Sequence, residues 1–112
     1  MPNRPLPEPP AEAETCPACC HKKATPRDAA LRKQLQNRLN RITGQLGGIS
    51  RMLEDNRYCG DILIQVAAVE SALQAFGYAV LKDHMETCVV EEIRQGNTAI
   101  VDEAVELMVK LK

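Results

Sequence analysis

Three side chains, Cys59, His84 and Cys88, combine residue types and spacing suited to binding a metal ion. His84 and Cys88 are four residues apart, so on an α-helix their side chains share one face about one turn apart. An imidazole nitrogen and a thiolate placed in this way can reach a single metal ion. Two thiolates and one imidazole form a soft ligand set, which favours Cu(I) or Zn(II) over harder ions.

The number of ligands helps to choose between these two metals. Three ligands suit trigonal Cu(I), whereas a structural zinc site normally has four. A His-x-x-x-Cys pair can also arise by coincidence, and buried cysteines are common, so the spacing alone leaves a metal site open.

A second group of possible ligands lies near the N-terminus, in Cys16, Cys19, Cys20 and His21. They could form a Cys-x-x-Cys half-site with an accessory metal or thiol role, although one zinc ion could not comfortably use all four. The alternative is a cysteine-bearing tail without structure. Residues 1–24 are rich in proline and lack an apolar period, so we expect a disordered tail followed by a folded domain over 25–112.

Composition and charge limit the class of protein. The 112 residues and net charge of −1 fit one small domain plus a tail, and the five cysteines in a chain with prolines in place of a signal peptide's apolar stretch indicate reduced thiols in the cytoplasm. We find no apolar run of the ~18 residues that span a bilayer, and therefore expect no membrane contact. Residues 22–57 hold nine basic and three acidic residues. This block suggests a nucleic-acid partner, although solvated helices are often equally basic.

The elements that must position these residues are all helical. Thr25 as cap and Pro26 at the first helical position predict a helix start, and apolar residues then recur every three or four positions to about residue 55, at Leu31, Leu35, Leu39, Ile42, Leu46, Ile49 and Leu53. Gly44, Gly47 and Gly48 weaken this helix, and we expect close approach of another helix to compensate.

Two further helices are predicted, a long one over about 61–94 and a short one over 99–111 after Gly96, and no strand pattern is present. The protein is therefore expected to be all-α, with a long–long–short, three-helix protomer. Two rods and a stub cannot cover their own apolar faces, which predicts a helical-bundle dimer or tetramer. Cys59 lies ~37 Å from His84 along a straight helix, so an antiparallel partner would have to bring the second Cys59 to the site.

Three segments carry a resemblance to a known family: residues 38–45 (RLNRITGQ), 57–65 (RYCGDILIQ) and 83–88 (DHMETC). They resemble the CsoR/RcnR family of metal-sensing repressors over roughly residues 30–110, and the Cys–His–Cys spacing is similar to the copper-sensing branch. The resemblance implies a dimer of dimers with a Cu(I) site between subunits, formed by Cys59 of one chain and His84 and Cys88 of another. It also implies an apo form that binds operator DNA without a helix-turn-helix and releases it on Cu(I) binding, which derepresses copper-resistance genes.

The resemblance further implies roles for residues outside the ligand set. Tyr58 matches a residue beside the metal that couples it to DNA affinity, and Glu103 matches a second if one residue is dropped near 97–98, which leaves Glu106 open. Gln34, Arg38, Arg41 and Gln45 form a polar stripe opposite the leucines. Arg38 is the strongest DNA-contacting candidate, supported by Arg41, Arg32 and Lys33. Family members often carry a basic residue in the second helix where this chain has Glu70, Gln74 and Ala75, so its DNA footprint is expected to shift towards the first helix.

Other functions on the same scaffold remain open. A nickel or zinc sensor could use His21, whereas a persulfide sensor would need only the two cysteines. A copper chaperone or storage protein could use Cys16, Cys19 and Cys20. An enzyme acting on a small-molecule substrate is not expected, because the Cys–His pair has no oxyanion loop or other catalytic context.

Overall fold

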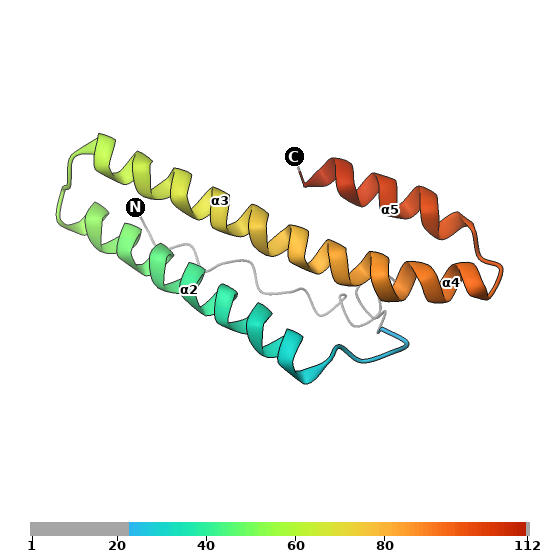
Figure 1. Cartoon of the computed structure of the whole chain (residues 1–112). Helices are drawn as coiled ribbons and strands as arrows, with labels where there is room; N and C mark the ends of the chain where they lie inside the picture. Colours follow the sequence, from blue (N-terminus) through green and yellow to red (C-terminus); the bar gives the residue numbers. More distant parts are fainter. Residues whose placement is uncertain (1–22, 112) are drawn as a thin grey trace, which may run out of the picture.

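The computed structural model describes residues 23–111, and within that range every regular element is a helix. The elements are α2 (Ala29–Glu54), α3 (Cys59–His84), the π-helical turn η2 (Met85–Val89), α4 (Val90–Arg94) and α5 (Ala99–Lys110). α3, η2 and α4 follow one another without a break and form one rod, Cys59–Arg94. Figure 1 shows α2 and α5 lying along this rod. The predicted long–long–short, all-α protomer is confirmed for the described residues.

The start of the first helix differs from the prediction. α2 begins at Ala29 with Asp28 at the N-cap position, so Thr25 and Pro26 lie outside the helix. Residues 23–28 instead form an extended arm, which doubles back from the start of α2 towards the C-terminal end of α3 (Figure 1). Lys23 and Arg27 both reach Asp83 there. These contacts hold residues 23–28 against α3. The sequence instead predicts a helix start at Thr25 and Pro26 and places Lys23 in the tail.

Two residues with positive φ angles close the connections between the helices. Asn56 (φ 53°) follows α2, and Gly96 (φ 89°) follows α4. Asparagine and glycine are the residues that adopt this left-handed conformation most easily, so both mark helix ends. Gly96 thereby confirms the predicted stop before α5. The two reversals set α2 and α5 alongside the same rod.

The core of the described chain is small and aliphatic. Its buried apolar residues are Leu35, Ile42, Val69, Val89, Ile100 and Ala104. Val89, Ile100 and Ala104 form one cluster, which fixes α5 against η2. At the other end of α5, a Cβ on Gly77 would lie 2.7 Å from Leu111 Cδ2, so α3 and the end of α5 meet closely at that glycine.

Much apolar surface remains uncovered. Leu53, Leu63 and Ile64 are each more than 60% exposed, at 62%, 64% and 66%. By length and composition alone, the rod Cys59–Arg94 is long and apolar enough to cross a membrane. The uninterrupted apolar runs of the sequence, considered alone, predict no such helix. An apolar helix in a protein of this size is equally suited to packing against another chain. The predicted inability of one protomer to cover its own apolar faces is confirmed.

The glycines of α2 do not have the predicted neighbour within the protomer. A Cβ on Gly44 would meet nothing within 4 Å, and those on Gly47 and Gly48 would meet only the side chain of Arg51. The expectation of a helix packed closely at these positions is therefore wrong for the single chain. α3 packs instead on the side of α2 that carries Leu35 and Ile42.

Candidate metal centre

His84 is the last residue of α3, and its side chain is half-buried. Its Nε2 atom is buried and has no hydrogen-bond partner among the described residues. A buried imidazole nitrogen is normally paired, because leaving it without a partner costs about 1–3 kcal/mol. A metal ion is one group that would satisfy such a nitrogen, so His84 fits the ligand role expected of it.

Cys88 follows one turn later, in η2, and is a half-buried free thiol. The turn between the two residues is π-helical rather than α-helical. Thr87 Oγ1 donates a hydrogen bond of 2.8 Å to the carbonyl oxygen of Asp83, one turn back. Such back-bonding competes with the α-helical ladder. Single π-helical turns within α-helices are frequent at functional sites.

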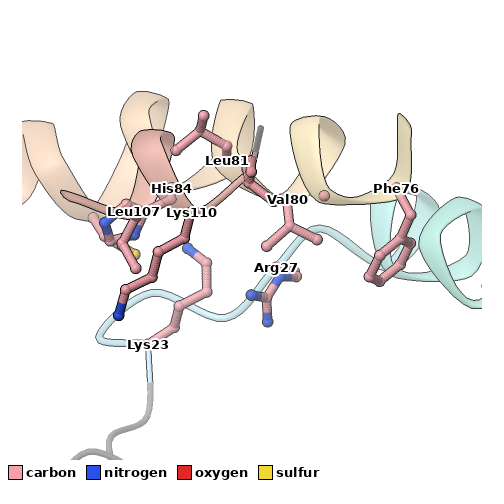
Figure 2. A pocket seen from close by; sticks show the side chains of 11 residues that line it. Lys23, Arg27, Phe76, Val80, Leu81, His84, Leu107 and Lys110 are labelled. Carbon is pink, nitrogen blue, oxygen red and sulfur yellow. The ribbon is translucent and has the colours of Figure 1, made fainter. Parts of the chain in front are cut away.

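His84 and Cys88 line the same groove, an open space of about 400 Å³ between α3, α5 and the arm. Most of its wall is apolar, and three cationic side chains stand at its edge: Lys23, Arg27 and Lys110. In Figure 2, His84 and Leu107 lie at one end of the groove and Phe76 lies at the other. The structure therefore brings the imidazole and one thiol to a common, largely apolar surface.

Cys59 is absent from this groove. It is the first residue of α3, exposed to solvent, at the opposite end of the helix from His84. Among residues 23–111, no three His, Cys, Asp or Glu side chains gather closely enough to hold a metal ion. The groove of one chain therefore contains two of the three expected ligands, His84 and Cys88. The cysteines and histidine expected as accessory ligands, Cys16, Cys19, Cys20 and His21, lie outside the described residues.

The residues expected beside the metal differ in their placement. Tyr58 occupies the N-cap position of α3 and is 76% exposed, with its ring so close to Gly60 that a Cβ there would lie 2.6 Å from Cε2. It therefore accompanies Cys59 rather than His84. Glu103 and Glu106 are both exposed on α5, and neither lines the groove that contains His84.

Sequence reasoning missed the charged cluster beside His84. Asp83 is only 8% exposed, and its Oδ2 atom lies 3.4 Å from Arg27 Nε and 3.6 Å from Lys23 Nζ. Lys23 Nζ also donates a 2.6 Å hydrogen bond to Thr87 Oγ1. These residues are about sixty positions apart, and no periodic pattern connects them. The one signal in the sequence is the adjacency of an aspartate to the histidine.

Of the expected DNA-contacting residues, Arg38 and Arg41 share one exposed face of α2, whereas Arg32 and Lys33 are exposed on other sides of its first turns. Gln34, Asn37, Arg38 and Arg41 line a shallow hollow, and Arg32 and Lys33 are exposed one turn earlier. The ion pairs found within residues 23–111 leave all four of these cations unpaired. Gln45 departs from the predicted stripe, because its Oε1 atom is buried without a hydrogen-bond partner in the described chain. It faces inward, and the exposed stripe is shorter than predicted.

Comparison with known proteins settles the family. Residues 31–110 match the model of a family described as metal-sensitive transcriptional repressors. The chain belongs to this family. The family, which corresponds to the CsoR/RcnR group, is one of transcriptional repressors and not of enzymes.

Individual family members share sequence and fold with the chain. The copper-sensing transcriptional repressor CsoR of Bacillus subtilis is 40% identical over 77 residues, which cover 69% of this chain and 76% of that protein. The crystal structure of CsoR with Cu(I) from Geobacillus thermodenitrificans superposes with a TM-score of 0.74 at 36% identity, covering 80% of this chain and 95% of that one. The nickel-responsive regulator InrS gives a TM-score of 0.61 at 33% identity, covering 82% and 98% of the two chains.

Proposed function

We propose that the chain is a cytoplasmic, Cu(I)-responsive transcriptional repressor that binds operator DNA as the apo form and releases it when Cu(I) binds, which derepresses copper-resistance genes. The metal is held between subunits by Cys59 of one chain and by His84 and Cys88 of another. The observation that carries the proposal is the groove lined by both His84 and Cys88, in which His84 Nε2 lies buried with no hydrogen-bond partner among residues 23–111. The third ligand, Cys59, stands at the opposite end of the same helix.

The chemistry of the donor set supports copper. Two thiolates and one imidazole offer a soft, three-coordinate site, which suits Cu(I) better than four-coordinate zinc. Cys59, His84 and Cys88 would hold the Cu(I) ion, which would thereby cross-link two subunits. The CsoR proteins similar to this chain are copper-sensing, and the Geobacillus structure contains Cu(I).

The exposed apolar surface supports an oligomer. An antiparallel copy of α3 would cover apolar side chains such as Leu63 and Ile64, which the protomer leaves exposed. The same arrangement would bring its Cys59 to the groove of the first chain. We infer a homodimer as the unit that completes the metal site, and a pair of such dimers as the DNA-binding form.

The exposed face of α2 is the proposed DNA-binding surface. Arg38 is its central residue, with Arg41, Arg32 and Lys33 contributing further phosphate contacts. Their guanidinium and ammonium groups have no acidic partner in the described chain and are free to bind phosphates. Tyr58 beside Cys59, and Glu103 on α5, are proposed to couple the metal to this surface.

A titration of the protein on DNA from its own promoter tests the function. Fluorescence anisotropy should show tight binding by the apo protein and release by one Cu(I) per protomer, but no release by Zn(II), Ni(II) or polysulfide. The Cys59→Ala variant should bind the DNA and fail to release it. Release by Ni(II) but not by Cu(I) would make the chain a nickel sensor, like InrS. Absence of DNA binding by the apo protein would favour a copper chaperone or store.

The N-terminal thiols are proposed to bind an accessory metal ion. Cys16, Cys19, Cys20 and His21 supply soft ligands a few residues before Lys23, which itself lines the groove. A variant lacking residues 1–22 should lose any metal bound beyond one Cu(I) per protomer and keep the copper-dependent release of DNA. Loss of that release would instead make the tail part of the sensing site.

A further inference from the structure

The N-terminal arm is joined to the metal-ligand segment by a charge cluster in which Asp83 and Lys23 are largely buried and the Arg27 side chain is 38% exposed. Asp83 immediately precedes His84 and is 8% exposed, and the Lys23 side chain is 11% exposed. Lys23 Nζ and Arg27 Nε lie 3.6 Å and 3.4 Å from the same oxygen, Oδ2. Ion pairs on a protein surface contribute little, whereas the Lys23–Asp83 pair is largely withdrawn from water and is therefore screened less by salt.

Neither the hydrogen bonding nor the charge of this cluster is fully balanced. The distances to Asp83 Oδ2 are those of ion pairs, and this buried oxygen accepts no hydrogen bond within the described chain. Two cations also face a single carboxylate, which leaves one positive charge in excess. Lys110 stands at the edge of the same groove and adds to the excess. The arm therefore presents surplus positive charge to the place where His84 and Cys88 lie.

Two successive contacts connect the arm to Cys88, one of the proposed metal ligands. Lys23 Nζ donates to Thr87 Oγ1 at 2.6 Å, and Thr87 Oγ1 lies 3.7 Å from Cys88 Sγ. Lys23 and Arg27 also line the groove together with both proposed ligands. Lys23 is thus connected to Cys88 through Thr87, and Arg27 faces the same groove.

We propose that Lys23, Arg27 and Asp83 form a latch that Cu(I) binding tightens, so that the arm is held against α3 and its cations are withdrawn from operator DNA. The inference rests on the proposed function. Cu(I) binding replaces the two thiol protons, which leave to solvent, by one unit of positive charge, so the site becomes more negative by one charge and attracts the surplus positive charge of the latch.

The arm adjoins the proposed DNA-binding helix, so the state of the latch determines whether Lys23 and Arg27 are available to DNA. Residues 23–28 lead directly into α2, whose first turns carry Arg32 and Lys33. When the latch opens, Lys23 and Arg27 extend the basic face of α2 and can neutralise phosphates. Withdrawing either cation from a phosphate weakens DNA binding and lowers its salt dependence. Operator phosphates and the copper–thiolate centre thus compete for the same two cations.

Two charge-matched double variants test the latch. K23Q/R27Q removes two charges from the groove, whereas R32Q/K33Q removes two charges from exposed positions of α2. Cu(I) affinity is measured in the absence of DNA by competition with a chromophoric chelator. We expect K23Q/R27Q to bind Cu(I) about fivefold more weakly than the unmodified protein and R32Q/K33Q to bind it unchanged. Equal Cu(I) affinities for the two variants would overturn the latch.

Hydrogen exchange supplies a readout that does not depend on DNA release. The backbone amides of residues 24–30, apart from Pro26, should exchange more slowly once the full-length protein is loaded with Cu(I), and K23Q/R27Q should lose this protection. Unchanged exchange of the arm in a protein that still releases DNA on Cu(I) binding would reject the latch and leave the proposed function standing. A protein that binds DNA but fails to release it with Cu(I) would reject the proposed function itself.

Discussion

Cys59 and His84 are the first and last residues of one uninterrupted helix, α3. At 1.5 Å per residue, the 25 steps between them separate the two side chains by about 37 Å. A helix cannot fold back within this length without a break, and the π-helical turn η2 begins only after His84. No single chain with this α3 can place Cys59, His84 and Cys88 on one metal ion.

Mixed oligomers are expected to restore copper binding that each parent has lost. Cys59→Ala and Cys88→Ala should each remove Cu(I) binding, because each deletes one ligand from every site. A dimer containing one chain of each kind has one site with both substitutions and one site with neither. After unfolding and refolding of an equal mixture, half of the dimers are mixed, and about a quarter of the sites should bind Cu(I) tightly.

The measurement is the Cu(I) stoichiometry obtained by chelator competition before and after mixing. Refolding each variant alone serves as the control and should give no tight site. If all three ligands came from the same chain, mixing would restore nothing. A stoichiometry of zero in the mixture would thus refute the inter-subunit site.

Replacing Gly44 or Gly77 by alanine should show which of the two helix surfaces has room for an added methyl group. Gly44 of α2 has open space around it, so Gly44→Ala should gain up to about 1 kcal/mol in the free energy of unfolding from helix propensity. A Cβ on Gly77 would lie 2.7 Å from Leu111 Cδ2, so Gly77→Ala must displace the end of α5 and should be the less stable variant of the two.

Thermal unfolding at one fixed protein concentration measures both changes, since the stability of an oligomer depends on concentration. A clear loss of stability for Gly44→Ala would show that this face of α2 is packed against another chain. Sedimentation of the variant would then show a smaller assembly than that of the unmodified protein.

Local patterns in the sequence were sufficient for the helices and for part of the site. Apolar spacing placed all three helical segments, and the four-residue spacing of His84 and Cys88 placed both on one groove. The arm could not be predicted in this way, because Lys23 and Asp83 are brought together by the antiparallel packing of α2 on α3. The helix also begins at Ala29 with Asp28 as N-cap, three residues later than the predicted start at Pro26 with Thr25 as N-cap.

Residues at the limits of a pattern were the least predictable. Gln45 continues the spacing of the polar stripe, yet its side-chain oxygen is buried. A helix face turns gradually relative to its neighbour, so the last member of a stripe can rotate out of solvent. The π-helical turn at η2 coincides with a hydrogen bond from Thr87 Oγ1 to the carbonyl oxygen of Asp83, and residue spacing reveals neither feature.

Arg38 and Arg51 offer a matched pair for the DNA surface, since both are exposed arginines of α2. Arg38 lines the hollow formed with Gln34 and Arg41, whereas Arg51 lies in the last turn of the helix. Arg38→Ala should weaken operator binding and reduce the slope of log affinity against log salt by about one for each phosphate that is no longer neutralised. Arg51→Ala should change neither quantity.

The affinity of the apo protein for its promoter DNA at several salt concentrations measures both effects. Cu(I) affinity without DNA should be the same in both variants, because neither arginine lines the groove of His84. Equal reductions of DNA affinity in the two variants would mean that the whole of α2, rather than the face around Arg38, contributes to binding.

Glu103 and Glu106 provide the means to identify the acid that couples the metal to DNA. Both are exposed on α5, carry the same charge and lie within one turn of each other. If Glu103 accepts a hydrogen bond from the second nitrogen of metal-bound His84, Glu103→Gln should weaken the effect of Cu(I) on DNA affinity and leave apo DNA binding intact. The coupling is the ratio of DNA affinities without and with Cu(I), and an allosteric coupling of this kind is typically about 5–150-fold. Glu106→Gln should retain the full ratio.

Loss of coupling in Glu106→Gln alone would assign the role to Glu106, and full coupling in both variants would show that His84 is oriented by neither acid. In that last case the buried Asp83 latch, which adjoins His84 in the chain, would be the remaining charged contact through which the metal reaches α2.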